Sequence, residues 1–224
     1  MYKRQLKYRV IPALLLKNGG LVKTFKFKES KYIGDPINAI RIFNEKEVDE
    51  LMVLDISASK EDREPDYELV EQFASECFMP LAYGGGIKNV EQANRIFLTG
   101  VEKICLQTSA IENPKLVTDL ANRFGSQSIM VSIDIKKNWL GNSYIYNSKS
   151  GKNIKGNWLK LLNSYVDLGA GEILLNAVDK DGTLSGPDLD LIREASQEID
   201  VPLILAGGIS SLLDIKNAIE AGAN

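Results

Sequence analysis

The sequence contains no histidine among its 224 residues. This absence excludes Ser-His and Cys-His nucleophile pairs, and it excludes every metal site that needs an imidazole ligand. Acid–base chemistry must therefore come from Asp, Glu, Lys, Tyr or Cys, and the carboxylates are the leading candidates. No metal ion or other cofactor is expected.

Cysteine is almost as scarce, since Cys77 and Cys105 are the only two residues of this type. Both lie in apolar stretches, which predicts reduced core thiols in a cytoplasmic protein and no disulfide framework. The sequence contains no run of about 18 apolar residues, the length that a membrane-spanning helix needs. The charged N-terminus also lacks the apolar segment of a signal peptide. A formal net charge of −3 argues against a general nucleic-acid-binding protein, because the basic surface is missing.

Short runs of Val, Ile and Leu alternate with stretches of helical spacing along the whole chain. The runs lack a polar alternation, which is typical of strands buried on both faces of a parallel sheet. Seven strands are predicted, near residues 9–16, 50–56, 80–83, 103–106, 128–135, 171–177 and 202–206. Helices are predicted over 37–46, 66–77, 90–98, 114–124 and 189–199. This alternation indicates βαβ units and an α/β fold.

An internal repeat defines the fold class more closely. Pro202–Ile209 repeats Pro80–Ile87 after 122 residues, and Glu172 follows Glu50 at the same spacing. A repeat of about half a barrel predicts a (βα)8 TIM barrel made of two half-barrels, as a single domain over residues 1–224. By the repeat, the chain is truncated after the seventh strand and helix, and the eighth βα unit is absent. We therefore expect either an incomplete sequence or another element that covers the open edge.

Glycine turns follow the third and the seventh predicted strand, where (βα)-barrels place their active sites. Glycines let backbone N–H groups approach an anion without interference from a side chain. The candidate phosphate-binding residues are Gly85, Gly86, Thr108, Asp181, Gly182, Gly207 and Gly208, with Lys23 in the first loop as a cationic partner. Tight strand-to-helix turns would also explain a single glycine pair. Two symmetry-related pairs favour a phosphorylated small-molecule substrate with two anionic ends.

Asp134 ends the fifth predicted strand, within the apolar run Val131–Ile135. A carboxylate inside such a strand is unfavourable unless it is paired or functional. Asp134 is therefore the candidate acid–base residue, and a structural acid bonded to a neighbouring loop is the alternative.

A second set of charged residues lies at the starts of predicted strands one, two, four and six. These residues are Arg9, Glu50, Lys103 and Glu172. Their side chains would point into the lower mouth of the barrel, where they could form a ring of alternating charge. From spacing alone, a salt-bridge plug that stabilises the barrel floor is the favoured interpretation.

Longer motifs extend over essentially the whole chain. They are Gly34–Pro36, Asp49–Ser59, Gly84–Ile87, Phe124–Gln127, Asp134, Gly169–Leu175 and Asp179–Thr183. With these motifs the chain resembles the cyclase (HisF) subunit of imidazole glycerol phosphate synthase. The resemblance implies a HisH-like glutaminase on the barrel floor, from which ammonia crosses the barrel to a substrate phosphorylated at both ends. The four charged floor residues would then be the gate through which ammonia enters.

The chain departs from this family at one of the two aspartates that serve the cyclase reaction as acid and base. Asp134 matches the second aspartate, whereas Leu15 stands in the place of the first. Leucine carries no proton, and general acid–base catalysis typically contributes about 10² to 10⁴ in rate. A retained gate beside a lost aspartate resembles the divergent HisF-like branch associated with acetamidino sugars of surface polysaccharides such as lipopolysaccharide. In that branch a separate sugar amidotransferase acts on the nucleotide-linked sugar.

Three functions remain open at this point. The first is ammonia delivery for sugar amidation, with little cyclase activity in the barrel itself. The second is a working cyclase of histidine biosynthesis, in which another residue replaces the lost aspartate. The third is a non-catalytic scaffold that binds and activates a glutaminase without passing ammonia.

Overall fold

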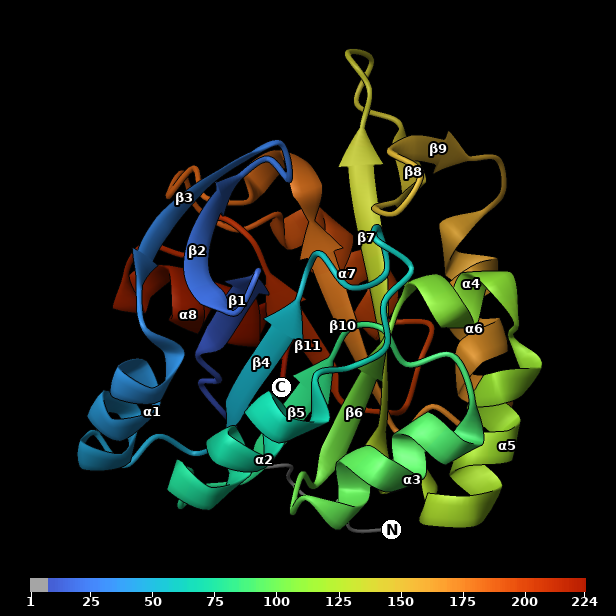
Figure 1. Cartoon of the computed structure of the whole chain (residues 1–224). Helices are drawn as coiled ribbons and strands as arrows, with labels where there is room; N and C mark the ends of the chain where they lie inside the picture. The colour runs from blue at the N-terminus through green and yellow to red at the C-terminus, as the bar shows by residue number, and fades with distance from the viewer. Residues whose placement is uncertain (1–7) are drawn as a thin grey trace, which may run out of the picture.

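The computed structural model describes residues 8–224 and has an α/β architecture (Figure 1). Seven parallel strands form one curved sheet in their sequential order. They are β1 (Ala13–Lys17), β4 (Leu51–Asp55), β5 (Leu81–Gly84), β6 (Lys103–Leu106), β7 (Ile129–Lys137), β10 (Glu172–Ala177) and β11 (Leu203–Ala206). The predicted α/β class with parallel strands is confirmed, and the strand order is the one that a TIM barrel requires.

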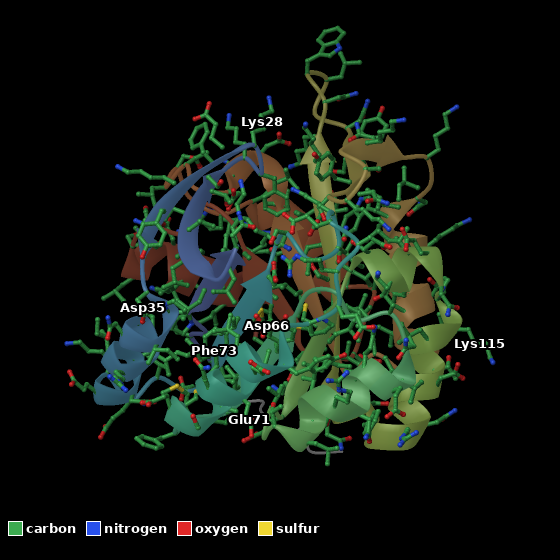
Figure 2. All side chains as sticks on the ribbon, in the orientation of Figure 1. Lys28, Asp35, Asp66, Glu71, Phe73 and Lys115 are labelled. Atoms are coloured by element: carbon green, nitrogen blue, oxygen red, sulfur yellow. The ribbon has the colours of Figure 1, made fainter. Side chains whose placement is uncertain are left out.

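Helices cover the outer face of this sheet (Figure 1). They are α1 (Pro36–Glu45), α2 (Tyr67–Glu76), α3 (Val90–Leu98), α4 (Thr108–Glu112), α5 (Lys115–Phe124), α6 (Trp158–Asp167), α7 (Leu189–Ser196) and α8 (Leu212–Glu220), with 3₁₀ turns η1 (Ser126–Ser128) and η2 (Val178–Lys180). Polar caps set several of their starts: the Asp35 and Asp66 carboxylates accept from backbone N–H groups of α1 and α2. Figure 2 labels both caps, and Phe73, which α2 buries completely. Within the described residues, no helix has the length and apolar character needed to cross a membrane.

Two antiparallel excursions extend the sheet beyond its parallel strands. The first contains β2 (Gly20–Phe25) and β3 (Glu29–Gly34), which continue from β1 as hairpins. The second contains β8 (Ser143–Asn147) and β9 (Lys152–Ile154), which return from β7. The sequence predicted no strand between residues 17 and 36, because its lysines and glycines hide the pattern. Asn18 and Gly19 both have positive φ, the geometry of a tight two-residue hairpin turn.

The core is divided into two layers by the sheet. One large cluster of side chains packs between the strands and the helices. A smaller cluster lies on the concave face and consists of Met52, Ala82, Cys105, Met130, Leu174 and Ile204. Successive residues of a strand point to opposite faces, so each strand supplies both layers. The concave layer is the barrel interior, and it sets the wall of the site described below.

The first strand begins later than the sequence predicted. β1 begins at Ala13, whereas the prediction placed its start at Arg9. Pro12 has no N–H group to donate, so it contributes to strand pairing only through its carbonyl oxygen, which accepts from Met52 N at 3.0 Å.

Within residues 8–224, no ladder joins β1 to β11. The glycine turns after β5 and β11 repeat one conformation, since Gly85 and Gly207 have φ values of 123° and 105°.

Candidate active site

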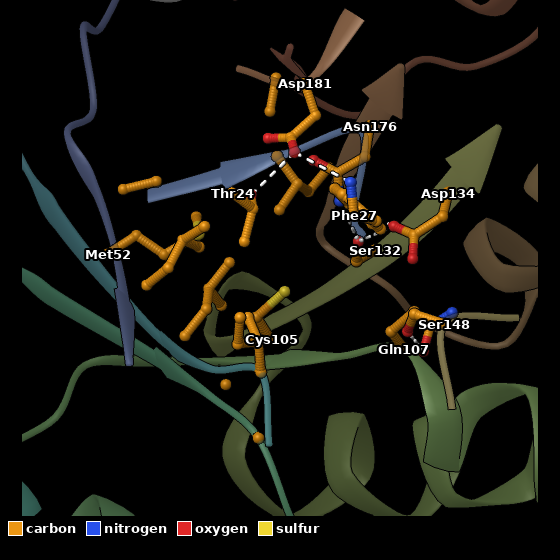
Figure 3. Close-up of a pocket in the computed structure, with 18 of the residues that line it drawn as sticks. Thr24, Phe27, Met52, Cys105, Gln107, Ser132, Asp134, Ser148, Asn176 and Asp181 are labelled. Atoms are coloured by element: carbon orange, nitrogen blue, oxygen red, sulfur yellow. Dashed lines mark hydrogen bonds between the residues drawn. The ribbon is translucent and has the colours of Figure 1, made fainter. Parts of the chain in front are cut away.

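A cavity of about 380 Å³ opens at the C-terminal ends of the parallel strands (Figure 3). It brings together most of the residues selected from the sequence: Leu15, Gly85, Gly86, Thr108, Asp134, Asp181, Gly182, Gly207 and Gly208. Lys23 does not line this cavity; its exposed side chain lies at a neighbouring hollow beside β1, β2 and β3. The predicted acid–base residue and the two glycine turns therefore share one site, and the predicted cation of the first loop stands outside it.

Asp134 lies near the top of β7 and is 3% exposed. Its Oδ1 accepts hydrogen bonds from Asn176 Nδ2 at 2.8 Å and from Ser132 Oγ at 3.3 Å. Burial raises the pKa of the Asp134 carboxyl from 3.8 to about 6, and the charge of Asp181 acts in the same direction. Hydrogen bonds from Asn176 and Ser132, together with the nearby Ser148 hydroxyl, oppose that rise. A carboxyl with this pKa can both give and take a proton near neutral pH.

Leu15 lines the same cavity from β1, where it pairs with Leu54 of β4. Its side chain is half-buried, and it supplies only apolar surface. Among the described residues, the carboxylates that line this cavity are Asp55, Asp134 and Asp181. The position that the resemblance assigns to one catalytic aspartate therefore faces the cavity and carries no titratable group.

Packing explains the two glycine turns without any ligand. A Cβ atom on Gly85 would lie 2.5 Å from the Asp55 carbonyl oxygen, and one on Gly207 would lie 2.7 Å from that of Ala177. Both positions also have positive φ, which side chains rarely adopt. The space alone thus requires glycine. The assignment of phosphate to these turns stays a prediction.

Asp181 anchors the first excursion over the cavity. One of its carboxylate oxygens, Oδ2, accepts from Thr24 Oγ1 at 2.7 Å and from the backbone N–H of Phe27 at 3.1 Å. Lys26 N donates to the Asp181 carbonyl oxygen at 3.0 Å. These contacts hold Lys26 and Phe27 at positive φ, so the Phe27 side chain is turned into the cavity wall. This carboxylate is therefore engaged with the β2–β3 hairpin.

The second excursion closes the opposite side of the mouth. Ser148 donates from Oγ to Gln107 Oε1 at 3.0 Å, and Gln107 Nε2 donates to the Tyr146 carbonyl oxygen at 3.3 Å. The Phe27 and Tyr146 rings meet edge to face with centroids 6.5 Å apart, which joins the two excursions. Ser148 and Lys149 consequently line the cavity although they are far from β6 in the sequence.

Sequence reasoning missed Ser132, Ser148 and Asn176. Ser132 precedes Asp134 by two residues, so both side chains point to the concave face of β7. Asn176 is the register partner of Asp134 on β10. The two-residue periodicity could have indicated Ser132, but Asn176 and Ser148 become neighbours of Asp134 only once the strand pairing is known.

The four charged floor residues meet at the opposite end of the strands. Arg9 contacts Glu50 at 2.6 Å and Glu172 at 3.1 Å. Lys103 contacts Glu50 at 2.9 Å and Glu172 at 3.0 Å. Each charge therefore has two opposite neighbours in a closed ring. Glu50 and Glu172 are only 2% and 7% exposed, so the ring is largely withdrawn from water.

Apolar side chains separate this ring from the cavity. On β10 the concave face carries Glu172, Leu174 and Asn176 in turn, while β6 carries Lys103 and Cys105. Four residues of strand span about 13 Å, which is the height between the ring and Asn176. Burial raises the pKa of the Cys105 thiol to about 12, and so it stays neutral. Any path between ring and cavity thus has an uncharged wall.

Within residues 8–224, no cluster of Cys, Asp and Glu side chains is arranged to hold a metal ion.

Comparison with known proteins agrees with this architecture. The family model described as histidine biosynthesis protein matches residues 9–224. A Leptospira interrogans protein named as imidazole glycerol phosphate synthase subunit HisF is 52% identical over 218 residues, covering 96% of this chain and 85% of that protein. A Pseudomonas aeruginosa protein named hisF2 is 48% identical, covering 96% and 86%. The HisF subunit of Streptococcus sanguinis is 39% identical, covering 97% and 86%. The chain therefore belongs to the histidine biosynthesis protein family and, within it, to the HisF family.

Proposed function

We propose that this chain is the synthase subunit of a glutamine amidotransferase complex and receives ammonia through its barrel. A HisH-like glutaminase docks on the floor around Arg9, Glu50, Lys103 and Glu172, and ammonia enters through this ring. A small neutral molecule can pass the apolar interior near Cys105 without the desolvation cost that a charged one would meet. The passage ends at the cavity beside Asp134.

The acceptor of this ammonia in our proposal is a nucleotide-linked sugar, which a separate sugar amidotransferase converts to its acetamidino form. Leu15 carries this part of the proposal. A cyclase that closes an imidazole ring needs an acid and a base at opposite sides of its substrate, and Leu15 supplies neither. Asp134, whose pKa is raised to about 6, keeps the ability to exchange a proton near neutral pH. Loss of one catalytic group beside an intact entry ring favours delivery over cyclisation.

The phosphate-binding assignment belongs to the same proposal. The backbone around Gly85–Gly86 and Gly207–Gly208 lies on two sides of the cavity. Thr108, at the start of α4, donates its hydroxyl to Gln107 Oε1 at 2.8 Å and would turn it toward the phosphate on binding. These groups suit a phosphorylated small molecule that spans the cavity. Asp181, whose carboxylate holds the β2–β3 hairpin, would order the cover of the bound substrate.

The test is ammonia-dependent cyclase turnover by the chain and by a Leu15→Asp variant. We expect no turnover from the parent and measurable turnover from the variant, because the substitution restores a carboxylate at the β1 position that the resemblance assigns to the first catalytic aspartate. Leu15→Asn is the matched control, since the asparagine side chain has nearly the same shape as aspartate but cannot act as an acid or a base. Family-like turnover by the parent would refute the loss of cyclase chemistry.

A working cyclase is the second candidate function. It is favoured by relatives named imidazole glycerol phosphate synthase subunit HisF and by the pKa of Asp134, which suits an acid or a base. Rescue of a strain that lacks the cyclase would establish this function.

A non-catalytic scaffold for the glutaminase makes a different prediction. If the chain is only a scaffold, Lys103→Met should leave the stimulation of the glutaminase unchanged. It should have no effect on ammonia transfer, because a scaffold passes no ammonia. If the ring conducts ammonia, the same variant keeps the stimulation and loses the coupling between glutamine hydrolysis and product formation.

A further inference from the structure

The side chain of Asn176 forms the tightest contact to Asp134 in the cavity. Its Nδ2 donates to Asp134 Oδ1 at 2.8 Å and to Ser132 Oγ at 3.0 Å. The two residues face each other because Asn176 and Asp134 are register partners on β10 and β7. Ser132 Oγ also reaches Asp134 Oδ1, at 3.3 Å. The three side chains thus form a closed triangle of hydrogen bonds.

Both bonds that this triangle makes to the Asp134 carboxyl group lie on one oxygen, Oδ1. Figure 3 shows the other oxygen directed away from Asn176, toward the side on which Ser148 and Gln107 lie. Ser148 lies in the turn between β8 and β9, whereas Asn176 and Ser132 lie on the sheet strands β10 and β7. A carboxyl group fixed through one oxygen by rigid strands keeps its second oxygen in a constant direction.

We propose that Asn176 is a positioning residue for Asp134: with Ser132 it orients the carboxyl so that one oxygen stays bonded to the sheet and the other serves the cavity. The inference rests on the proposed function only in assigning the chemistry of the cavity to Asp134. Asn176 acts on this chemistry through the carboxyl, and its donor opposes the effect of burial on the charged form.

Few other charged groups act on this carboxyl. Asp181, after η2, disfavours ionisation of Asp134. The Cys105 thiol on β6 is neutral, and its own pKa is raised further by the charge of Asp134. Lys149, on the β8–β9 turn, is paired with Glu112 and Asp62. Asn176 and Ser132 are consequently the main groups of the sheet that favour the ionised form.

A carboxyl-carbon NMR titration of aspartate-labelled protein tests this inference. The Asp134 signal is assigned by its disappearance in Asp134→Asn. Asn176→Val and Asn176→Thr form a matched pair, because the side chains have the same shape and only Thr has a hydroxyl donor. Removal of a donor to the charged form is expected to raise the pKa of Asp134 by about 1 in Asn176→Val, with a smaller rise in Asn176→Thr.

Equal pKa values for Asp134 in the parent, Asn176→Val and Asn176→Thr would overturn the proposal. If Asn176→Val does not fold, Ser132→Ala removes the other sheet donor, and an unchanged titration in that variant would overturn it equally. The titration requires neither a glutaminase nor an ammonia acceptor. The proposed function can therefore fail in the Leu15→Asp and Lys103→Met experiments while the positioning role stands, and the reverse also holds.

Discussion

Replacement of Asp134 by asparagine should stabilise the protein at neutral pH and leave it unchanged in acid. Burial raises the pKa of Asp134 from 3.8 in the unfolded chain to about 6 in the native state. Because the native pKa is the higher one, the carboxyl's contribution to stability is fully present below pH 3.8 and is lost as pH rises through 6. The difference of about 2.2 corresponds to roughly 3 kcal/mol above pH 7.

The asparagine side chain has nearly the same shape, and its oxygen can still accept from Asn176 and Ser132. It cannot ionise, so Asp134→Asn should gain about 2 to 3 kcal/mol in the free energy of unfolding at pH 7.5. Between pH 4 and 6 the parent should lose about 1.4 kcal/mol per pH unit relative to the variant.

Urea unfolding at closely spaced pH values measures this difference directly. Asp190→Asn is the control, because the Asp190 side chain is 79% exposed and the substitution removes the same charge. We expect the control to change stability by less than about 0.5 kcal/mol. A free-energy difference between parent and Asp134→Asn that stays constant from pH 4 to 7.5 would refute the reasoning.

Further predictions concern other parts of the chain. Thr24→Val removes the hydroxyl bond to Asp181, which should cost about 1 kcal/mol and speed amide hydrogen exchange in the β2–β3 hairpin; unchanged exchange would contradict that anchor. Trp139 is 90% exposed and Trp158 is 6% exposed. Iodide should therefore quench only the Trp139 fluorescence, and Trp139→Phe should abolish quenching. The buried Cys105 thiol should resist a water-soluble disulfide reagent until the protein is unfolded, whereas its reaction in the native state would disprove the burial.

The strands of the barrel were predictable because each is a short, predominantly apolar run between glycine or polar turns. β5 and β11 are recognisable even by their repeat, and the same turns follow both. The hairpin of β2 and β3 was not predictable in this way. Its residues are largely exposed, and it is held by Asp181, which lies about 157 residues from Thr24 in the chain. Such long-range pairing leaves no local signal.

In the candidate site, too, residues with a local sequence signal were predictable, and residues placed by long-range strand pairing were not. Asp134 is conspicuous in the sequence, since a lone carboxylate interrupts an apolar strand. Asn176 and Ser148 are ordinary polar residues until the strand register and the return of β8 bring them beside it. Lys23 was selected for its charge alone. Charge does not fix direction in an extended hairpin, where alternate side chains point to opposite faces.

The energetics of the floor ring bear on the choice between a plug and an entry. Two nearly buried glutamates and two partly buried cations must leave water, and their pairing in a protein interior often does no more than offset that cost. An apolar plug of the same volume would close the floor with equal or greater stability. Glu172 Oε2 is, moreover, buried without a hydrogen-bond partner among the described residues, which an optimised plug would avoid. Stability alone therefore does not account for the ring, and this argues for the entry role that we propose for it.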